Sequence, residues 1–66
     1  MPDKWTGELL GRMHNERVTR KELAKQLGVG SAYVTMVLNG NRNPPNAEQR
    51  FFDAFTAVLK ARESNG

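Results

Sequence analysis

The chain has 66 residues and a formal net charge of +3, and its basic residues are concentrated in the middle, where residues 17–50 carry +4 while the two ends together carry −1. A chain of this length forms one small domain that buries only about 60% of the surface exposed by the unfolded chain, so its core must be efficient or shared with a partner. The absence of Cys and the presence of a single His exclude disulfides, thiolate sites and a Cys/His zinc centre.

A first helix is predicted near the start of the chain. Asp3 is a suitable N-cap residue, and apolar residues then recur at helical spacing, namely Trp5, Leu9, Leu10 and Met13. We expect Trp5 to cover the core. The polar run HNER, residues 14–17, predicts a turn, and Val18 is expected to be a buried anchor before the next element.

A second helix is predicted from Arg20 to about Leu27. Thr19 and Glu22 have the spacing of a capping box, in which each side chain bonds to the backbone of the other residue. The inward side chains of this helix are Leu23, Ala24 and Leu27. Gly28 stands where a helix ends with a residue at positive φ, a conformation that only Gly adopts freely.

A third helix, from Ser31 or Ala32 to about Leu38, turns three apolar side chains inward at helical spacing, namely Val34, Val37 and Leu38. Five residues then face wholly or partly outward: Ser31, Ala32, Tyr33, Thr35 and Met36. The run NGNRNPPN, residues 39–46, is the strongest break in the chain and separates this helix from the next.

A last helix is predicted over about 46–62, with residues 63–66 as a frayed tail. Asn46 and Gln49 have the spacing of a second capping pair. The apolar residues of this segment are Phe51, Phe52, Phe55, Val58 and Leu59. Phe51 and Phe55 are expected in the core. Phe52 and Leu59 lie together at one flank, where they could cover the first helix or form a dimer interface. No strand pattern is present, so the sequence predicts an all-α domain over residues 1–66.

The second and third helices have the features of a helix-turn-helix, residues 19–39. Two short helices joined by a glycine turn must cross steeply, and Ala24 supplies the room where they cross. The segment TRKELAKQLGVGSAYVTMVLNGNRNPP resembles the helix-turn-helix of the phage repressor and Cro family, the lambda-repressor-like domains, over about residues 18–45. Several constrained positions agree at once: Leu23, Ala24, Gly28, Val29, Val34, Asn39 and Gly40.

The sequence departs from the family in two respects. Gly30 stands where the family often has Ser or Thr before the recognition helix, so Ser31 is an alternative cap that shifts the helix start by one residue. Family members commonly carry two helices after the loop, whereas this chain has room for one long helix. We therefore expect four helices, with five as the alternative, and the dimer surface of the family is not carried over.

The resemblance implies that the recognition helix, residues 31–38, enters the DNA major groove. Base-reading then falls to Ser31, Ala32, Tyr33, Thr35 and Met36. None of these is a type that makes bidentate contacts to G or A, so direct readout should be modest. For Tyr33 and Met36, packing within the protein is the alternative.

Phosphate contacts are expected around the second helix and in the loop after the third. The residues concerned are Thr19, Arg20, Lys21, Asn39, Asn41, Arg42 and Asn43. For Lys21 and Lys25, a merely solvated surface is an equally good interpretation.

Two functions remain open. The first is a sequence-specific double-stranded DNA-binding transcriptional regulator, a repressor of phage or Cro type that acts as a homodimer without metal or cofactor. The second is a protein-interaction module or antitoxin-like protein that binds a partner through the Phe-bearing last helix. An enzyme is not expected, because no catalytic residue set and no phosphate-binding Gly loop are present.

We expect a stand-alone protein of the size of Cro. No segment approaches the ~18 apolar residues of a membrane span, and the first residues lack the layout of a signal peptide. The sequence therefore predicts a cytoplasmic location and no membrane partner. The resemblance implies the bacterial nucleoid, or a phage-encoded protein in a bacterial host.

Overall fold

The computed structural model describes residues 3–65, with side chains up to Glu63. This part of the chain forms four α-helices and no strand: α1 (Lys4–Glu16), α2 (Arg20–Leu27), α3 (Ser31–Leu38) and α4 (Ala47–Asn65). The predicted all-α, four-helix fold is confirmed, and the described residues contain no fifth helix. None of these helices combines the length and the apolar character that a bilayer span requires.

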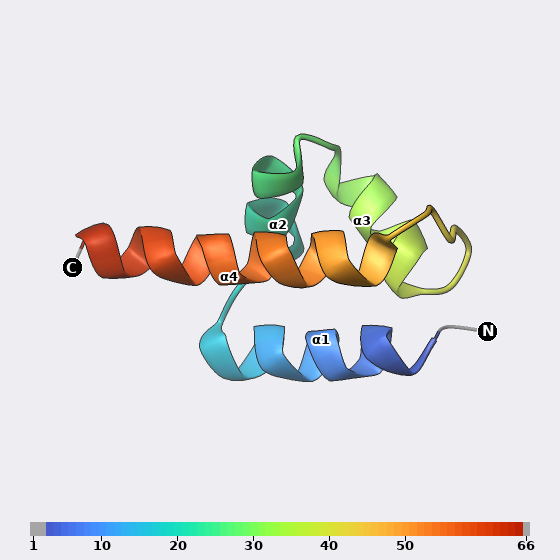
Figure 1. Cartoon of the computed structure of the whole chain (residues 1–66), viewed down its shortest axis with the longest axis horizontal. Helices are drawn as coiled ribbons and strands as arrows, with labels where there is room; N and C mark the ends of the chain where they lie inside the picture. Colours follow the sequence, from blue (N-terminus) through green and yellow to red (C-terminus); the bar gives the residue numbers. More distant parts are fainter. Residues whose placement is uncertain (1–2, 66) are drawn as a thin grey trace.

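The long helix α4 runs through the middle of the molecule (Figure 1). Helix α1 lies on one side of it and runs in the same direction, and α2 and α3 lie on the other side. Helix α2 packs against both α4 and α3, and α1 packs against α4 and α3. This arrangement leaves the connection between α2 and α3 at the edge of the molecule opposite α1.

One core joins the four helices, and its members are largely those expected from the apolar spacing. The buried apolar residues are Leu9, Met13, Val18, Leu23, Ala24, Val34, Val37, Leu38, Ala47, Phe51, Ala54, Phe55 and Val58. Leu27 is half-buried at the edge of this cluster. Trp5 covers it, with its ring edge-on to Phe51 at 5.6 Å between ring centroids. The expectations for Val18 and Trp5 are therefore confirmed.

The first three helices end with the same backbone motif. A left-handed residue follows each helix: Arg17 at φ 57°, Gly28 at φ 75° and Gly40 at φ 83°. In each case the backbone N–H groups of this residue and of the residue after it donate to carbonyls in the last turn of the helix. At the end of α2, Gly28 N donates to Lys25 O at 3.3 Å and Val29 N donates to Ala24 O at 3.0 Å. This is the Schellman motif, which satisfies carbonyls that have no partner within the helix. The expectation for Gly28 is confirmed.

The capping of α1 and α3 differs from the sequence prediction, although α3 begins at Ser31, one of its two predicted starts. Asp3 stands at the N-cap of α1, but its side chain makes no capping bond; instead the buried Thr6 hydroxyl donates to the Asp3 carbonyl at 2.6 Å. Gly30, not Ser31, is the N-cap of α3, because its extended backbone (φ −80°, ψ 154°) directs its carbonyl to Tyr33 N and Val34 N. Ser31 is thus the first residue within the helix.

The proposed capping pair before α4 was wrong. Asn46 has a left-handed backbone, φ 59°, and not the extended conformation typical of an N-cap. The Gln49 side chain instead donates to Asp53 Oδ1 at 2.9 Å, one turn further along the same helix.

Two helix ends also differ. The run HNER is not a turn as a whole, since α1 continues through Glu16 and only Arg17 leaves the helix. The helix persists because the Schellman motif at Arg17 brings the apolar Val18 into the core beside Met13. At the other end, residues 63–65 are helical and not a frayed tail, because Arg62 anchors the last part of α4, as described below; Gly66 lies outside the described residues.

Candidate nucleic-acid interface

Helix α3 is held by one face and exposes the other. Val34, Val37 and Leu38 are at most 2% exposed and fasten the helix to the core. On the outer face Ser31 and Ala32 are exposed, whereas Tyr33, Thr35 and Met36 are half-buried. Tyr33 is half-buried because it packs against the core cluster, so part of its ring is occupied by the protein itself. The free surface of α3 lies mainly at its first turn.

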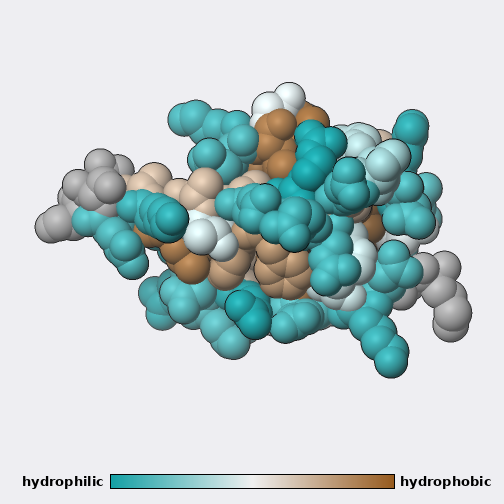
Figure 2. Space-filling model, in the orientation of Figure 1, coloured by the Kyte–Doolittle hydropathy of each residue, from teal (hydrophilic) through white to brown (hydrophobic). Residues whose placement is uncertain are grey.

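The geometry of the α2–α3 pair follows from three small or apolar residues. Ala24 is 3% exposed, Gly28 makes the left-handed turn, and Val29 packs against the core edge. In Figure 1 the two helices diverge from their connection at the upper edge of the molecule. Figure 2 shows mostly hydrophilic residues around this edge and a small hydrophobic patch at the connection. Leu27 and Val29, at the end of α2 and in the turn, are half-buried.

A shallow groove joins the start of α2 to the start of α3. It is lined by Thr19, Lys21, Glu22, Ala24, Lys25, Val29 and Ser31. Thus the fold brings the predicted phosphate-binding residues Thr19 and Lys21 together with the predicted base-reading residue Ser31. Lys25, which the sequence left undecided, faces the same groove. Arg20 is exposed at the first turn of α2, beside this groove.

The capping box at the start of α2 is formed as predicted. Glu22 N donates to Thr19 Oγ1 at 3.1 Å, and Thr19 N donates to Glu22 Oε1 at 3.0 Å. The Thr19 hydroxyl also donates to the same carboxylate at 3.2 Å. Since the hydroxyl hydrogen and the backbone N–H of Thr19 are both donated to Glu22, Thr19 positions the helix and has no donor left for a phosphate in this arrangement.

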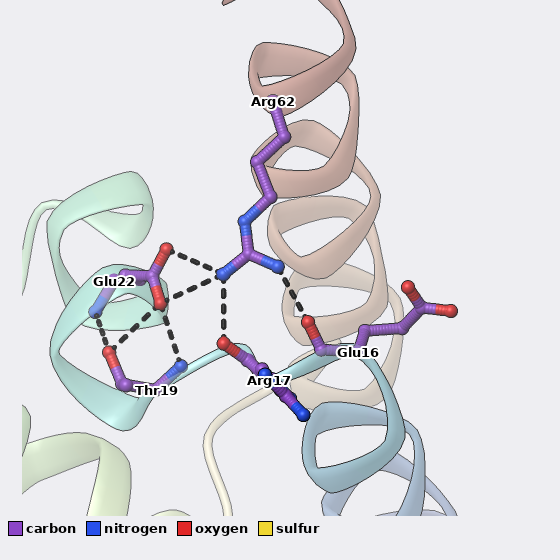
Figure 3. A network of polar contacts seen from close by, with 5 residues as sticks. All are labelled: Glu16, Arg17, Thr19, Glu22 and Arg62. Carbon is purple, nitrogen blue, oxygen red and sulfur yellow. Dashed lines mark hydrogen bonds and ion pairs between the residues drawn. The ribbon is translucent and has the colours of Figure 1, made fainter. Parts of the chain in front are cut away.

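Arg62 of α4 reaches the same carboxylate from the other side (Figure 3). Its Nη2 lies 3.1 Å from Glu22 Oε1 and 3.0 Å from Oε2 and donates to the Arg17 carbonyl at 2.8 Å, while Nη1 donates to the Glu16 carbonyl at 2.6 Å. One guanidinium therefore binds the end of α1, the following turn and the start of α2. A cation at the C-terminus of α1 is also favoured by the dipole of that helix.

The pKa of the Glu22 carboxyl is lowered from its usual value by these contacts. The backbone N–H of Thr19 contributes most and the side chain of Arg62 next, whereas partial burial acts in the opposite direction. Glu22 is therefore ionised over the whole neutral range, and an ion pair with Arg62 balances its charge.

The loop after α3 forms a second exposed group at the opposite end of that helix. Asn39, Asn41, Arg42 and Asn43 are all exposed, as their predicted phosphate-binding role requires. Arg42 and Asn43 border a small pocket with Asp3, Trp5 and Thr6 at the start of α1. The structure thus keeps these residues apart from the α2–α3 groove, at the other end of α3.

Positive charge is concentrated on the part of the chain that carries these features. From Arg17 to Asn46 there are five basic residues, all exposed, and their acidic neighbour in this range is Glu22 alone. The basic residues are Arg17, Arg20, Lys21, Lys25 and Arg42. Because Glu22 is paired with Arg62, its field at the surface is reduced further.

The flank of α4 that the sequence offered as a dimer interface faces α1. Phe52 packs beside Trp5, at 6.4 Å between ring centroids, and the Arg12 guanidinium lies 5.7 Å from the Phe52 ring centre. Phe52 and Leu59 nevertheless stay half-buried. Figure 2 shows a hydrophobic strip along the edge of α4 next to α1. Phe52 therefore covers the first helix and leaves part of its surface free.

The sequence analysis missed Arg62, although a signal was present. Residue 62 follows Phe51, Phe55 and Val58 at the spacing i+11, i+7 and i+4, so it lies on the core-facing stripe of α4. A long cationic side chain at the end of such a stripe extends past the core to the neighbouring helix ends.

Within residues 3–63 no three His, Asp or Glu side chains are grouped so as to hold a metal ion. Comparisons of the chain with models of known protein families, with curated proteins and with solved structures found no match.

Proposed function

We propose that this chain is a sequence-specific double-stranded DNA-binding transcriptional regulator, a repressor of the phage and Cro type, with α3 as its recognition helix. The observation that carries the proposal is the state of α3: its inner face is locked in the core, its first turn is exposed, and exposed cationic or amide residues flank both of its ends. The resemblance of residues 18–45 to the helix-turn-helix of that family supports the same proposal.

The dimensions of α3 fit a major groove. An α-helix with its side chains is about 10–12 Å in diameter and fits a major groove about 12 Å wide, and the eight residues of α3 at about 1.5 Å each extend about 12 Å within it. Arg20 and Lys21 near one end, and Arg42 with its neighbouring Asn residues at the other, are then suited to the phosphates on the two sides of the groove. Such contacts fix the orientation of the helix, and the bases are read from its first turn.

The residue types on α3 favour modest direct readout. Ser31 and Thr35 supply single hydrogen bonds, and Ala32, the Thr35 methyl and Met36 supply apolar contacts to thymine methyls. Much of the affinity is then electrostatic and falls steeply with salt. Discrimination between DNA sequences that the side chains do not provide comes from the shape and deformability of the DNA itself.

We further propose that two copies bind a two-fold-related operator, with half-sites about 34 Å apart. The free parts of Phe52 and Leu59 are apolar surface on α4 that is available for the second copy. The alternative of a partner-binding module would depend on the same two side chains, because Phe51, Phe55 and Val58 are consumed by the core.

Removal of single charges tests the proposal. R20Q and R42Q should each weaken binding to a DNA duplex several-fold and lower the slope of log K against log salt by roughly 0.9, the value for one phosphate contact. K60Q is the matched control, since Lys60 is an exposed cation on α4 away from the groove. Binding by R20Q and R42Q that is indistinguishable from binding by K60Q would contradict the proposal.

A further inference from the structure

Glu22 is out of place in the groove where we propose that phosphate binds. Among the residues that line this groove it is the acidic one, beside Lys21 and Lys25. A carboxylate a few ångströms from a phosphate repels that phosphate. The Glu22 carboxylate also occupies the start of α2, the place where the helix dipole would favour a bound anion.

The structure also shows how this charge is balanced. Arg62 approaches the carboxylate from α4, and Glu22 and Arg62 border a second surface depression on the side of α2 away from Ser31. Both oxygens of Glu22 lie within 3.1 Å of Arg62 Nη2. The cation thus neutralises Glu22 from behind without standing in the groove, whose lining does not include Arg62.

We infer that Arg62 is a positioning residue for DNA binding: it holds Glu22 against Thr19 and neutralises it, so that a DNA phosphate can approach the Lys21 and Lys25 side of the groove. This inference rests on the proposed DNA-binding function. It assigns a role in binding to a residue that touches no DNA and lies 40 residues away from Glu22 in the chain.

The first purpose of the test is to separate this role from a purely structural one. Arg62 also binds the Glu16 and Arg17 carbonyls, so its removal weakens the fold whatever Glu22 does. The two roles differ in how they respond to a second change at Glu22. The substitution Glu22→Gln keeps an oxygen that accepts the capping bond from Thr19 N but removes the charge that Arg62 balances.

The experiment is a salt titration of binding to a mixed-sequence DNA duplex by the wild type, R62Q, E22Q, R62Q/E22Q and the control K60Q. The inference predicts that R62Q weakens binding about tenfold and lowers the salt slope by roughly 0.9, as for one lost phosphate contact. E22Q should bind at least as well as the wild type, and the double variant should recover the affinity and slope of E22Q. K60Q should change both much less than R62Q does.

A structural role alone predicts a different result. R62Q/E22Q would then bind no better than R62Q, because a neutral Gln cannot replace the bonds of Arg62 to the Glu16 and Arg17 carbonyls, and this outcome would overturn the inference. Weakened binding by E22Q alone would overturn it as well. If the wild type itself binds no duplex at low salt, the proposed function fails and the inference fails with it, so the two failures are distinguishable.

R62K provides a second test that does not depend on the stability of R62Q. Lys keeps the positive charge but cannot make the forked set of bonds that Arg62 makes. The inference predicts that R62K melts at a lower temperature than the wild type and keeps its salt slope. A slope for R62K as low as that of a folded R62Q would show that charge balance at Glu22 is not what matters.

Discussion

Arg17 has a backbone conformation that its side chain disfavours. It lies in the left-handed region, at φ 57° and ψ 39°, where every residue with a Cβ is strained. The strain is tolerated because the Schellman motif of α1 requires this conformation and because Arg62 binds the Arg17 carbonyl. Gly at this position would keep both of these backbone interactions.

R17G should therefore stabilise the fold. Relief of the left-handed strain, partly offset by the greater freedom of Gly in the unfolded chain, gives an expected gain of up to about 1 kcal/mol in the free energy of unfolding. Urea denaturation measures it. The control R17A removes the same exposed side chain but keeps Cβ, so it should stay close to the wild type. A loss of stability in R17G would show that the Arg17 side chain contributes more than its backbone costs.

The lowered pKa of Glu22 leads to a second prediction at the scale of single residues, for the pH dependence of stability. Its folded-state pKa is lowered, first by the Thr19 N–H and then by Arg62, so it contributes stability above its unfolded-state pKa of about 4.3. This contribution is lost as the pH falls through the folded-state pKa. The wild type should melt above E22Q at neutral pH, and the difference should shrink as the pH falls below the unfolded-state pKa and through the lower folded-state pKa. A difference in melting temperature that does not change with pH would contradict this.

At the scale of elements, the turn between α2 and α3 depends on one backbone conformation. A Cβ added at Gly28 or at Gly30 would meet nothing within 4 Å, so space does not distinguish the two positions. Gly28 has a φ of 75° and Gly30 a φ of −80°. The cost of substitution at Gly28 is therefore conformational alone.

G28A should destabilise the fold by about 1 kcal/mol. G30A should change it less, because the loss of a favourable N-cap residue is offset by the smaller freedom of Ala in the unfolded chain. Thermal unfolding of the two variants side by side measures the difference, and each variant is the control for the other. If G30A proved as damaging as G28A, the left-handed turn would not be the feature that fixes how α3 is presented.

The helices themselves could be predicted from local patterns, and their ends only in part. The capping box at Thr19 and the glycine at 28 are local signals, and both were correct. The end of α1 at Arg17 was missed because a charged residue replaced the usual Gly of a Schellman motif. The end of α4 was missed because Arg62 is fixed by residues 40 or more positions away, which no local pattern reveals.

The candidate site divides in the same way. Its position on the first turns of α2 and α3 could be predicted because those helices are short and their apolar faces are clear. The sequence could not indicate that Lys25 shares a groove with Ser31 or that α4 balances the charge of Glu22. Both depend on the crossing of helices.

At the scale of the whole molecule, the adjacent residues Phe51 and Phe52 of α4 differ in their surroundings, since one lies in the core and the other is partly exposed. Phe51 is 3% exposed and packs edge-on against Trp5, whereas Phe52 is half-buried under Arg12. F51A should cost about 3–5 kcal/mol, enough to unfold a domain of this size, and F52A clearly less. Urea denaturation measures both.

The mass in solution then tests the proposed dimer. F52A should stay folded and shift the protein from dimer to monomer in sedimentation experiments, because it removes apolar surface that the fold leaves free. The control R50Q changes an exposed residue on the opposite side of the same helix and should leave the mass unchanged. If F52A and R50Q give the same mass as the wild type, the second copy does not bind through this flank of α4.

The measurement that tests the central proposal most directly is selection of bound sequences from random double-stranded DNA at two salt concentrations. The proposal predicts enrichment of a two-fold-related consensus, with log K falling by about 0.9 per phosphate contact as log salt rises. A pool that stays unenriched, with binding that disappears at physiological salt, would contradict it and would indicate a protein partner for the Phe52 and Leu59 flank of α4.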